Sequence, residues 1–296
     1  MKLLMITGDK SFGPGNPRFE LQKSAVGELT VVYWGPGGLI PRIPWKRFDV
    51  ITAQDPFWRG HLAWHLSWFL APRLNIQVHT DLSAYPLWKR MFARLQLWRA
   101  DTVRVVSEKI KQQVHDMVPN AVVSVLPVFI DISKFQSVVR TPHTGKHILW
   151  IGRFEEEKNP LEAIAVFREV LKGEPSAKLV MLGRGSLQKI LVEHAAGLPV
   201  DFPGWHDPVT YLETADVVLC TSWHESFGAS IIEALAAGVP VVAPDVGAAR
   251  EAGAIVVQRN ELSTAIGTAL KYGTAGRLLM HMPTAEEWTN RWLQTL

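Results

Sequence analysis

Cysteine is nearly absent from this chain of 296 residues, since Cys220 is the only one. A single thiol excludes an internal disulfide and a zinc site built from several cysteines. Long hydrophobic runs are missing too: the longest candidate, residues 62–72, is interrupted by His65 and Ser67 and falls short of the ~18 apolar residues that a spanning helix needs. Residues 1–8 have too short an apolar core for a signal peptide. We therefore expect a cytoplasmic protein.

Acidic residues are scarce in the first half of the chain and basic residues in the second. Residues 1–150 hold 19 Lys and Arg against 10 Asp and Glu, a net charge of +9, whereas residues 151–296 hold 12 against 18, a net charge of −6. Eight of the 12 tryptophans also lie in the first half. Because a chain of this length commonly forms two domains, the split predicts two domains with different partners.

Alternating strand and helix patterns run through both halves. They predict strands at 2–6, 29–33, 48–52, 75–79, 102–106, 122–126, 147–152, 178–182, 216–220, 239–243 and 255–257, with a weak strand near Val200, and helices at 18–27, 57–70, 86–99, 107–117, 161–171, 187–196, 229–237 and 284–296. This alternation predicts an α/β fold of two doubly wound, Rossmann-like domains that face a central cleft. We place the domains at residues 1–140 and 145–283, because residues 136–146 lack apolar periodicity and read as a linker.

The densest polar motif follows the predicted strand 216–220. Its loop carries Glu225, Gly228 permits close backbone approach, and the helix that starts near residues 227–229 presents free N–H groups to an anion. Glu233 lies on that helix, eight residues after Glu225. The two carboxylates could bind the sugar and the ribose of a nucleotide sugar, or they could be solvated charges without a ligand.

A second polar motif follows the predicted strand 147–152. It places Arg153 and Lys158 five residues apart in a strand-to-helix loop. Together these bases could neutralise a diphosphate, the guanidinium through its planar fork and the ammonium as a point charge. The alternative is a solvated surface loop in which residues 155–157, all Glu, pair with the bases.

Together, these motifs resemble the retaining GT-B glycosyltransferases of family four, also described as glycosyl transferases group 1. The similarity covers most of residues 147–257 in the family's order and spacing. It is carried by Gly152-Arg153 with Lys158-Asn159-Pro160, by Gly183-Arg184-Gly185, by Glu225-Ser226-Phe227-Gly228, and by Glu233-Ala234 followed by Ala237-Gly238-Val239-Pro240-Val241-Val242.

The resemblance implies an enzyme that moves a hexose from a nucleotide sugar to an acceptor with retention of configuration. Positive charge on the diphosphate would stabilise the departing nucleotide, so no protein nucleophile is required. By analogy, Arg153 and Lys158 hold the diphosphate, Glu225 contacts the transferred sugar, Glu233 contacts the ribose, Gly183 borders the base, and the backbone at Ser226, Phe227, Gly228 and Ala229 contacts sugar and phosphate. A non-catalytic nucleotide-sugar-binding protein and a GT-B nucleotide-sugar epimerase are the alternatives.

The first half resembles the family more loosely. By that resemblance, His79 at the end of a predicted strand faces the reacting sugar or the acceptor, and Asp55 lies in a loop at the same edge. Gly13, Gly15 and Asn16 form a candidate acceptor or donor loop. Without the resemblance, His79 reads as a buried or capping histidine and the glycine loop as a plain turn. The family's terminal helix often crosses back to the first domain, which implies the same for residues 284–296.

Metal-binding motifs are weak. No Asp-x-Asp sequence occurs, although glycosyltransferases of the other main architecture usually hold a metal with it. His61 and His65 are spaced like two ligands on one helix face, but a third ligand and the glutamate of the His-Glu-x-x-His motif are missing. We therefore expect no metal and no cofactor beyond the nucleotide-sugar substrate.

The basic surplus is concentrated in residues 57–73 and 85–104, where Lys and Arg alternate with Trp and Phe. Basic helices with tryptophan can lie on an anionic membrane surface, which would bring the enzyme to a lipid-linked or glycan acceptor. The alternative is that the aromatic side chains fill the core and the bases are solvated. No nucleic-acid recognition motif is present, so we expect no nucleic-acid partner.

Overall fold

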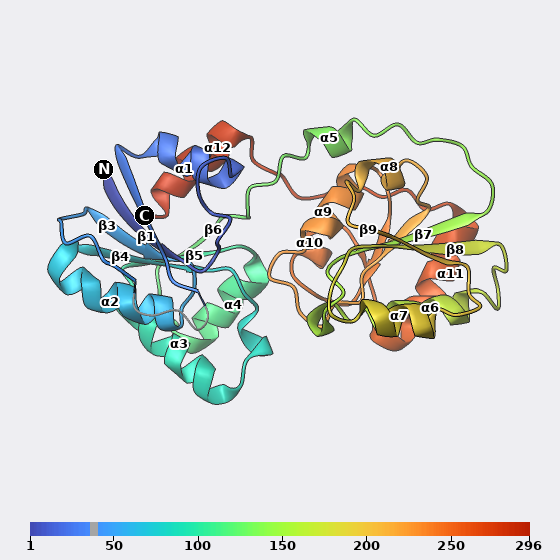
Figure 1. The fold of residues 1–296 in the computed structure, drawn as a ribbon, viewed down its shortest axis with the longest axis horizontal. Coiled ribbons are helices and arrows are strands. Elements are labelled where there is room, and N and C mark those ends of the chain that lie inside the picture. The colour runs from blue at the N-terminus through green and yellow to red at the C-terminus, as the bar shows by residue number, and fades with distance from the viewer. Residues whose placement is uncertain (36–40) are drawn as a thin grey trace. The chain divides into compact units, whose positions relative to one another are not determined.

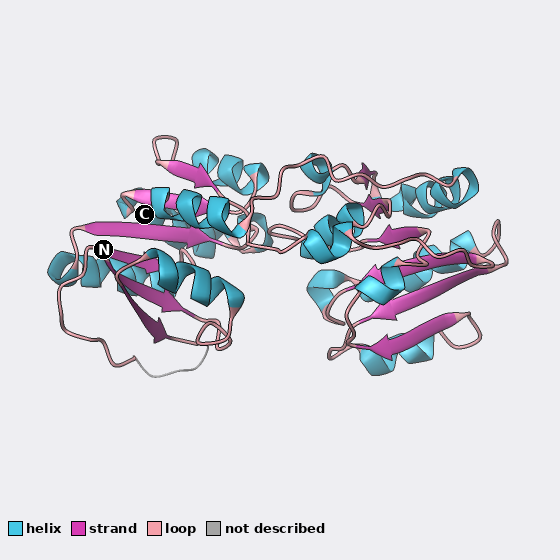
Figure 2. Ribbon diagram, turned by 90° about the horizontal axis from the view of Figure 1, so that it is seen from above, coloured by secondary structure: helices cyan, strands magenta, loops and turns pink. Residues whose placement is uncertain are grey.

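The structure, a computed structural model, describes residues 1–35 and 41–296. The chain forms two compact units, one made of Met1–Phe129 with Pro283–Leu296 and the other of Ile130–Met282. Each unit is a parallel sheet with helices on both faces (Figures 1 and 2). No helix in the described ranges is both long and apolar enough to cross a membrane.

The N-terminal unit contains a six-stranded sheet in the order β2-β1-β3-β4-β5-β6. All its strands pair in parallel. The order reverses between β1 and β3, so residues 8–16 and the start of the loop after β3 lie at the switch point, where doubly wound sheets bind ligands. Its elements are β1 (Lys2–Thr7), α1 (Pro17–Ala25), β2 (Glu28–Tyr33), β3 (Val50–Ala53), α2 (Trp58–Leu70), β4 (Arg73–Val78), η1 (Leu82–Ala84), α3 (Leu87–Arg99), β5 (Thr102–Val105), α4 (Glu108–Met117) and β6 (Val123–Val125).

The C-terminal unit contains a second parallel sheet in the order β12-β11-β10-β7-β8-β9. Here the order reverses between β7 and β10, which makes the loops after these two strands the candidate ligand site. Its elements are α5 (Ser133–Gln136), β7 (Lys146–Ile151), η2 (Glu156–Lys158), α6 (Pro160–Val170), β8 (Ala177–Leu182), α7 (Gln188–His194), β9 (Val200–Gly204), α8 (Val209–Leu212), β10 (Val217–Leu219), α9 (Ala229–Ala236), β11 (Val241–Ala243), α10 (Ala249–Ala252), β12 (Ile255–Val256), η3 (Arg259–Glu261) and α11 (Leu262–Tyr272).

The last helix, α12 (Ala285–Gln294), packs in the core of the N-terminal unit. Trp288 and Trp292 are fully buried, and their stacked ring centroids lie 6.2 Å apart. Trp288 Nε1 donates a 2.8 Å hydrogen bond to the carbonyl of Pro127. Burial of two tryptophans i, i+4 apart ties the end of the chain to the first unit, because each ring removes a large apolar area from water.

The division between the units falls at residue 129, earlier than the sequence predicted. Residues 130–145 belong to the C-terminal unit, where Phe135 is buried at 1% exposure and polar contacts add to its packing. Lys134 Nζ lies 2.9 Å from Asp207 Oδ2, and Arg140 Nη1 donates a 2.7 Å hydrogen bond to the carbonyl of Leu212. The expected linker therefore forms part of that unit and contains the short helix α5.

Helix α11 was not among the predicted elements. Leu262, Ile266, Ala269 and Leu270 are its buried residues, and Gly273 ends it with a positive φ of 58°. This spacing of apolar residues, followed by a C-cap glycine, is a helix signal. The helix could therefore have been found from the sequence.

Candidate functional site

Two loops meet at the switch point of the C-terminal sheet. Lys158, in the loop after β7, places its Nζ 2.5 Å from Oε1 of Glu225, in the loop after β10. Ser222 donates a 2.8 Å hydrogen bond to the same carboxylate oxygen. The side chains of Lys158 and Glu225 are 21% and 10% exposed, so this ion pair is largely shielded from water. The structure thus joins two of the predicted site residues and adds Ser222.

Backbone contacts hold these two loops together. The single O–H of Thr221 is shared between the carbonyls of Lys158 and Asn159, which lie 3.1 and 2.9 Å from Oγ1, and the N–H of Trp223 donates to the carbonyl of Glu157. Asn159 adopts a left-handed conformation, with a φ of 49°, before Pro160 begins α6. A non-glycine residue with positive φ is unusual and is favoured for asparagine. The loop geometry is therefore defined by the backbone as well as by the ion pair.

Arg259 braces the second loop from outside the predicted motifs. Its guanidinium donates to the carbonyls of Thr221 and Ser222 and stacks over the Trp223 ring at 3.9 Å from the centroid. It also pairs with Glu162 of α6. No sequence motif marked Arg259, since its partners are distant in the chain.

The loop 225–228 ends at the N-terminus of α9. Gly228 is the N-cap with a φ of 88°, a conformation that favours glycine. The N–H of Ala248 donates a 2.9 Å hydrogen bond to the carbonyl of Phe227. A Cβ on Gly247 would lie 2.6 Å from that carbonyl oxygen. The first N–H groups of α9 thus begin next to the Lys158–Glu225 pair, in a segment of fixed position.

Gly183 is required for the close approach of the loops after β7 and β8. Its φ is 153°, and a Cβ there would lie 1.8 Å from the carbonyl oxygen of Gly152. The N–H of Phe154 donates to the carbonyl of Arg184 at 2.9 Å. Any side chain at position 183 would push these two loops apart. Gly183 can therefore contact a ligand at the switch point only through its backbone.

Glu233 lies on α9, the helix that follows the loop 225–228. Burial raises the pKa of Glu233 to about 7; the positive charge of Lys134 opposes this rise and the negative charge of Asp207 adds to it. Among the described residues, its carboxylate has no hydrogen-bond or ion-pair partner. A half-buried carboxylate without a protein partner is suited to accept hydrogen bonds from ligand hydroxyls.

Arg153 pairs with Glu157 and not with the Lys158–Glu225 ion pair. Its Nη2 lies 2.6 Å from Oε1 of Glu157, and the Arg153 side chain is 66% exposed. Glu155 accepts hydrogen bonds from the backbone and hydroxyl of Ser186. Of the two predicted diphosphate ligands, Lys158 is therefore shielded and paired, whereas Arg153 is at the surface and can be released from a weak pair.

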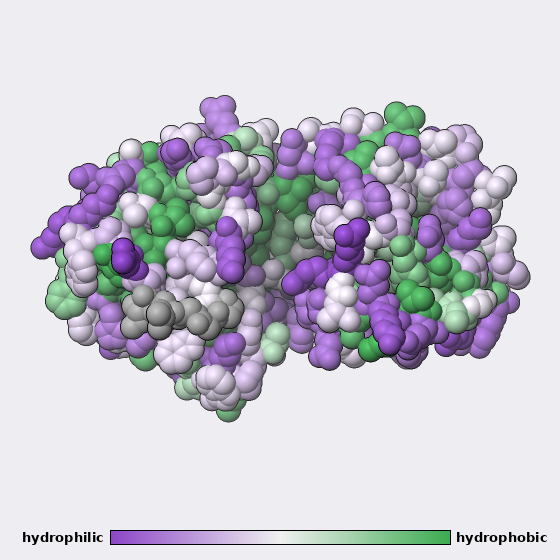
Figure 3. Space-filling model, viewed as in Figure 1, coloured by the Kyte–Doolittle hydropathy of each residue, from purple (hydrophilic) through white to green (hydrophobic). Residues whose placement is uncertain are grey.

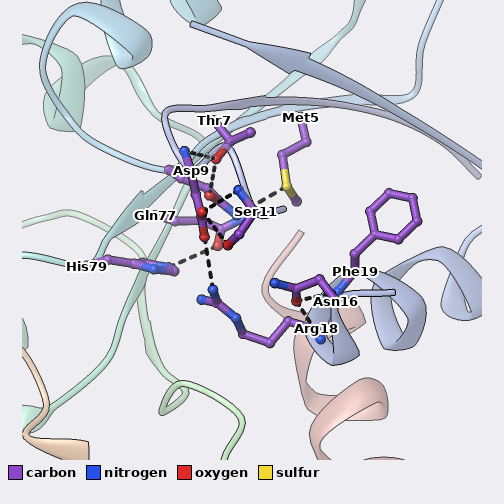
Figure 4. Close-up of polar contacts among 10 residues, drawn as sticks. Met5, Thr7, Asp9, Ser11, Asn16, Arg18, Phe19, Gln77 and His79 are labelled. Atoms are coloured by element: carbon purple, nitrogen blue, oxygen red, sulfur yellow. Dashed lines mark hydrogen bonds and ion pairs between the residues drawn. The ribbon is translucent and has the colours of Figure 1, made fainter. Parts of the chain in front are cut away.

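In the N-terminal unit, His79 follows β4 and is fixed by Gln77. His79 Nε2 lies 3.1 Å from Gln77 Oε1 (Figure 4). The same oxygen accepts a 2.9 Å hydrogen bond from Arg104 Nη1, and Gln77 Nε2 donates to Thr52 Oγ1. Because these partners fix the amide, His79 must donate from Nε2 and present the lone pair of Nδ1. Burial, with the charges of Arg104 and Arg18, holds the pKa of His79 well below its ordinary value.

Arg104 is a buried cation that sequence reasoning missed. It is 1% exposed, and its guanidinium donates to the carbonyls of Leu126 and Pro127 as well as to Gln77. Among the described residues it forms no ion pair with a carboxylate. Burial and the nearby charge of Arg18 lower the pKa of Arg104 to about 9. The sequence does contain a signal for this buried cation, because Arg104 stands among apolar residues in the predicted strand 102–106.

The remaining predicted residues of this unit have identifiable local roles. Asn16 caps α1 by accepting hydrogen bonds from the N–H groups of Arg18 and Phe19 (Figure 4), while the N–H of Gly15 donates to Glu20. Gly13 has open space around it. Asp55 pairs with Arg59 and, like His79, lines a hollow of about 460 Å³. The structure therefore brings Asp55 and His79 to one hollow, whose lining residues do not include the glycine loop.

The histidine pair on α2 is brought together. His61 Nε2 and His65 Nε2 lie 3.2 Å apart. Residues 1–35 and 41–296 contain no group of three His, Cys, Asp or Glu side chains that could hold a metal ion.

Comparisons with known proteins agree with this architecture. Residues 145–272 match the model of the family described as glycosyl transferases group 1. The GDP-mannose-dependent alpha-(1-6)-phosphatidylinositol dimannoside mannosyltransferase of Mycobacterium tuberculosis is 31% identical over 129 residues, which are 40% of this chain and 34% of that protein. The glycogen synthase of the same species is 28% identical over 226 residues, 70% of this chain and 54% of that protein. The matches thus span about a third to a half of these relatives.

A solved structure shares the fold of the whole chain. Anabaena HepE, in complex with UDP and glucose, superposes with a TM-score of 0.72 at 18% identity, covering 100% of this chain and 95% of that one. Two parallel doubly wound sheets, with the polar loops at the switch point of the second, define the GT-B class of fold. Its C-terminal unit is similar to the glycosyl transferases group 1 over residues 145–272.

Proposed function

We propose that this chain is a metal-independent glycosyltransferase that moves a hexose from a nucleotide sugar to an acceptor with retention of configuration. One observation carries the proposal. The shielded Lys158–Glu225 pair lies at the switch point of the C-terminal sheet, next to the N-terminus of α9. This is where doubly wound sheets bind nucleotides, and a cation with free N–H groups suits a diphosphate.

The donor would be bound along α9 and the two loops. Lys158 and Arg153 would neutralise the diphosphate, and the backbone N–H groups of residues 228 and 229 would bind its oxygens. Glu233, which is half-buried and has no hydrogen-bond or ion-pair partner among the described residues, would accept hydrogen bonds from the ribose. The backbone turn at Gly183 would border the base. One similar protein is named as GDP-mannose-dependent and another was solved in complex with UDP and glucose, so the base and the hexose are left to experiment.

The transfer step would rely on electrostatic stabilisation. As the glycosidic bond breaks, negative charge grows on the leaving diphosphate, and the ammonium of Lys158 and the helix N-terminus are fixed in place to stabilise it. Glu225 is a poor covalent nucleophile, since a cation and the Ser222 hydroxyl already hold one of its oxygens. We therefore assign Glu225 to orientation of the sugar and of Lys158, with attack by the acceptor on the face that the nucleotide leaves.

His79 is the candidate acceptor-side base in the N-terminal unit. Its neutral ring presents Nδ1, which can accept a proton or a hydrogen bond from a hydroxyl. We propose a glycan or lipid-linked acceptor, in line with the phosphatidylinositol dimannoside named for one relative. A cytoplasmic location, where nucleotide sugars would meet the enzyme, remains our prediction.

A thermal-shift screen of the full chain against UDP, GDP, ADP and their sugars tests the donor site. A ligand that binds only the folded state raises the stability with the logarithm of its concentration over its Kd. We expect one nucleotide to shift the Tm in wild type and to shift it much less in Glu233→Gln. If none shifts the Tm at millimolar concentration, the site assignment is wrong.

Product analysis separates the alternatives. Slow hydrolysis of the donor, or transfer to an acceptor mixture, unaffected by EDTA, supports a metal-independent transferase. Binding without consumption indicates a nucleotide-sugar-binding protein. Conversion of one nucleotide sugar into its stereoisomer indicates an epimerase, and loss of turnover with EDTA contradicts metal independence.

A further inference from the structure

Helix α3 turns its large apolar side chains outward. Its buried residues are only Ala93, Gln96 and Leu97. The opposite face, which on an ordinary surface helix is polar, exposes large apolar residues at successive i, i+3 and i+4 positions. Trp88 and Trp98 are 67% and 63% exposed, and the same face carries Leu87, Met91 and Leu95.

The exposed aromatic residues of α2 continue this face. The rings of Trp58 and Phe92 lie 4.8 Å apart. The Arg99 guanidinium lies 4.7 Å from the Trp64 ring and 4.6 Å from the Trp98 ring, which links the two helices. We call the whole set the α2–α3 aromatic surface; its exposed members are Trp58, Trp68, Phe69, Leu87, Trp88, Met91, Leu95 and Trp98.

Positive charge surrounds this surface, and exposed acid is missing from the same stretch of sequence. Residues 56–100 contain six Lys and Arg and one acidic residue, Asp81, which is 4% exposed and caps η1. In Figure 3 the region over α3, at the lower left, shows pale and green side chains beside purple ones. The six bases are Arg59, Arg73, Lys89, Arg90, Arg94 and Arg99; Arg59 is neutralised by its ion pair with Asp55, which precedes this stretch.

A hollow of about 560 Å³ opens along α3. Met91, Leu95 and Trp98 line it with Arg94 and residues 117–120. The walls are mainly apolar, while Arg94 supplies one exposed cation. Such a recess complements an amphiphile that has a hydrocarbon part and an anionic head.

We propose that the α2–α3 aromatic surface docks on an anionic phospholipid bilayer. The tryptophans would lie at headgroup level, the aliphatic side chains would enter the acyl boundary, and the bases would neutralise lipid phosphates. A second copy of the chain fits this surface less well, since two such faces would bring like charges together. Nucleic acid fits it less well too, because the exposed Leu87, Met91 and Leu95 offer nothing to a phosphodiester backbone.

Vesicle flotation of the full chain tests the proposal. We expect co-flotation with vesicles of phosphatidylcholine and phosphatidylglycerol, reduced by salt, and little with phosphatidylcholine alone. Each base near the surface contributes about a factor of five to partitioning, so Arg94→Gln, which removes the exposed cation of the α3 hollow, should weaken binding about fivefold. Trp88→Ser with Trp98→Ser should weaken it at least tenfold, at every salt concentration.

Matched controls make the outcome specific. Tyr272 is 72% exposed on the C-terminal unit, so Tyr272→Ser should float like wild type. All variants should keep the wild-type Tm and donor-induced thermal shift, which separates this proposal from the donor chemistry. The proposal fails if wild type does not float, or if the tryptophan variants float equally well. It also fails if the surface instead carries nucleic-acid binding or self-association that these variants abolish.

Discussion

The ammonium of Lys158 and the carboxylate of Glu225, 67 residues apart in the chain, form an ion pair between the two loops that flank the switch point of the C-terminal sheet. The pair therefore has two roles that substitutions can separate. It stabilises the loops, and it fixes a cation beside the N-terminus of α9, where we place the donor diphosphate.

Lys158→Met should lower both stability and turnover. Removing one partner leaves the shielded Glu225 charge with only its hydrogen bond from Ser222, which costs on the order of 2 kcal/mol, whereas Lys158→Met with Glu225→Gln should recover most of that loss. Turnover should stay at least a hundredfold below wild type in both variants, because the cation on the leaving group is missing. Chemical denaturation and donor hydrolysis measure the two effects. Recovery of turnover in the double variant would refute the catalytic role of Lys158.

Arg153→Ala should change donor binding without changing stability. The Arg153–Glu157 pair is exposed, and such pairs contribute at most about 1 kcal/mol. We expect an unchanged Tm and a tenfold or greater rise in the KM of the donor. Lys172→Ala removes a similarly exposed pair with Glu169 on the surface of the same unit and serves as the control. Equal kinetic effects of the two substitutions would mean that Arg153 does not reach the donor.

Glu233→Gln should alter the pH dependence of stability. The carboxyl has an ordinary pKa of 4.5 and, by burial, a folded-state pKa of about 7, so the folded state binds the proton more tightly. Its contribution is fully present below pH 4.5 and is lost as the pH rises through 7. The variant should thus be more stable than wild type at pH 8, by up to about 3 kcal/mol, and equal to it near pH 4.5.

Donor affinity should show the opposite trend for the same residue. The ionised carboxylate accepts hydrogen bonds from ribose hydroxyls and the protonated form accepts them less well. The Kd of the nucleotide sugar should therefore fall as the pH rises from 6 to 8 in wild type and stay flat in Glu233→Gln. Calorimetric titration at several pH values measures this. Identical pH profiles in both proteins would place Glu233 outside the donor site.

His79→Asn should reduce the acid sensitivity of the protein. The folded-state pKa of His79 lies well below the ordinary value of 6.5, so below pH 6.5 the unfolded chain binds a proton that the folded chain does not. This term destabilises wild type as the pH falls below 6.5. Melting curves between pH 5 and 8 should show a smaller loss of Tm in the variant, and parallel curves would contradict the neutral state of His79 in the folded protein.

Gly183→Ala should prevent normal folding of the C-terminal unit. A Cβ at position 183 would meet the Gly152 carbonyl oxygen at 1.8 Å, whereas one at Gly197, also with positive φ, would meet nothing within 4 Å. Gly197→Ala should therefore lower the free energy of unfolding by only about 1 kcal/mol, because alanine adopts a positive φ less readily than glycine. Yields and Tm values of the two variants test this, and a stable Gly183→Ala protein would show that the loops can separate.

Most of the fold could be predicted because parallel sheets leave local signals. Buried strands read as short apolar runs ending in glycine, as in residues 147–152, and the helix after them begins at Pro160. The division between the units falls at residue 129 rather than near 140, because residues 130–145 join the C-terminal unit through isolated contacts, such as the buried Phe135, that leave no periodic pattern. Helix α11 was missed although Leu262, Ile266 and Gly273 carried ordinary helix signals.

The chain's sequence by itself determined the α/β class, the two sheets and the polar loops after β7 and β10, since propensity, periodicity and glycine positions act over a few residues. Only the tertiary structure decided the pairing of Lys158 with Glu225, the surface position of Arg153, the buried Arg104 behind Gln77 and His79, and the outward tryptophans of α3. The physical reason is that ion pairing, burial and pKa shifts depend on which distant segments meet, and local sequence carries no information on that.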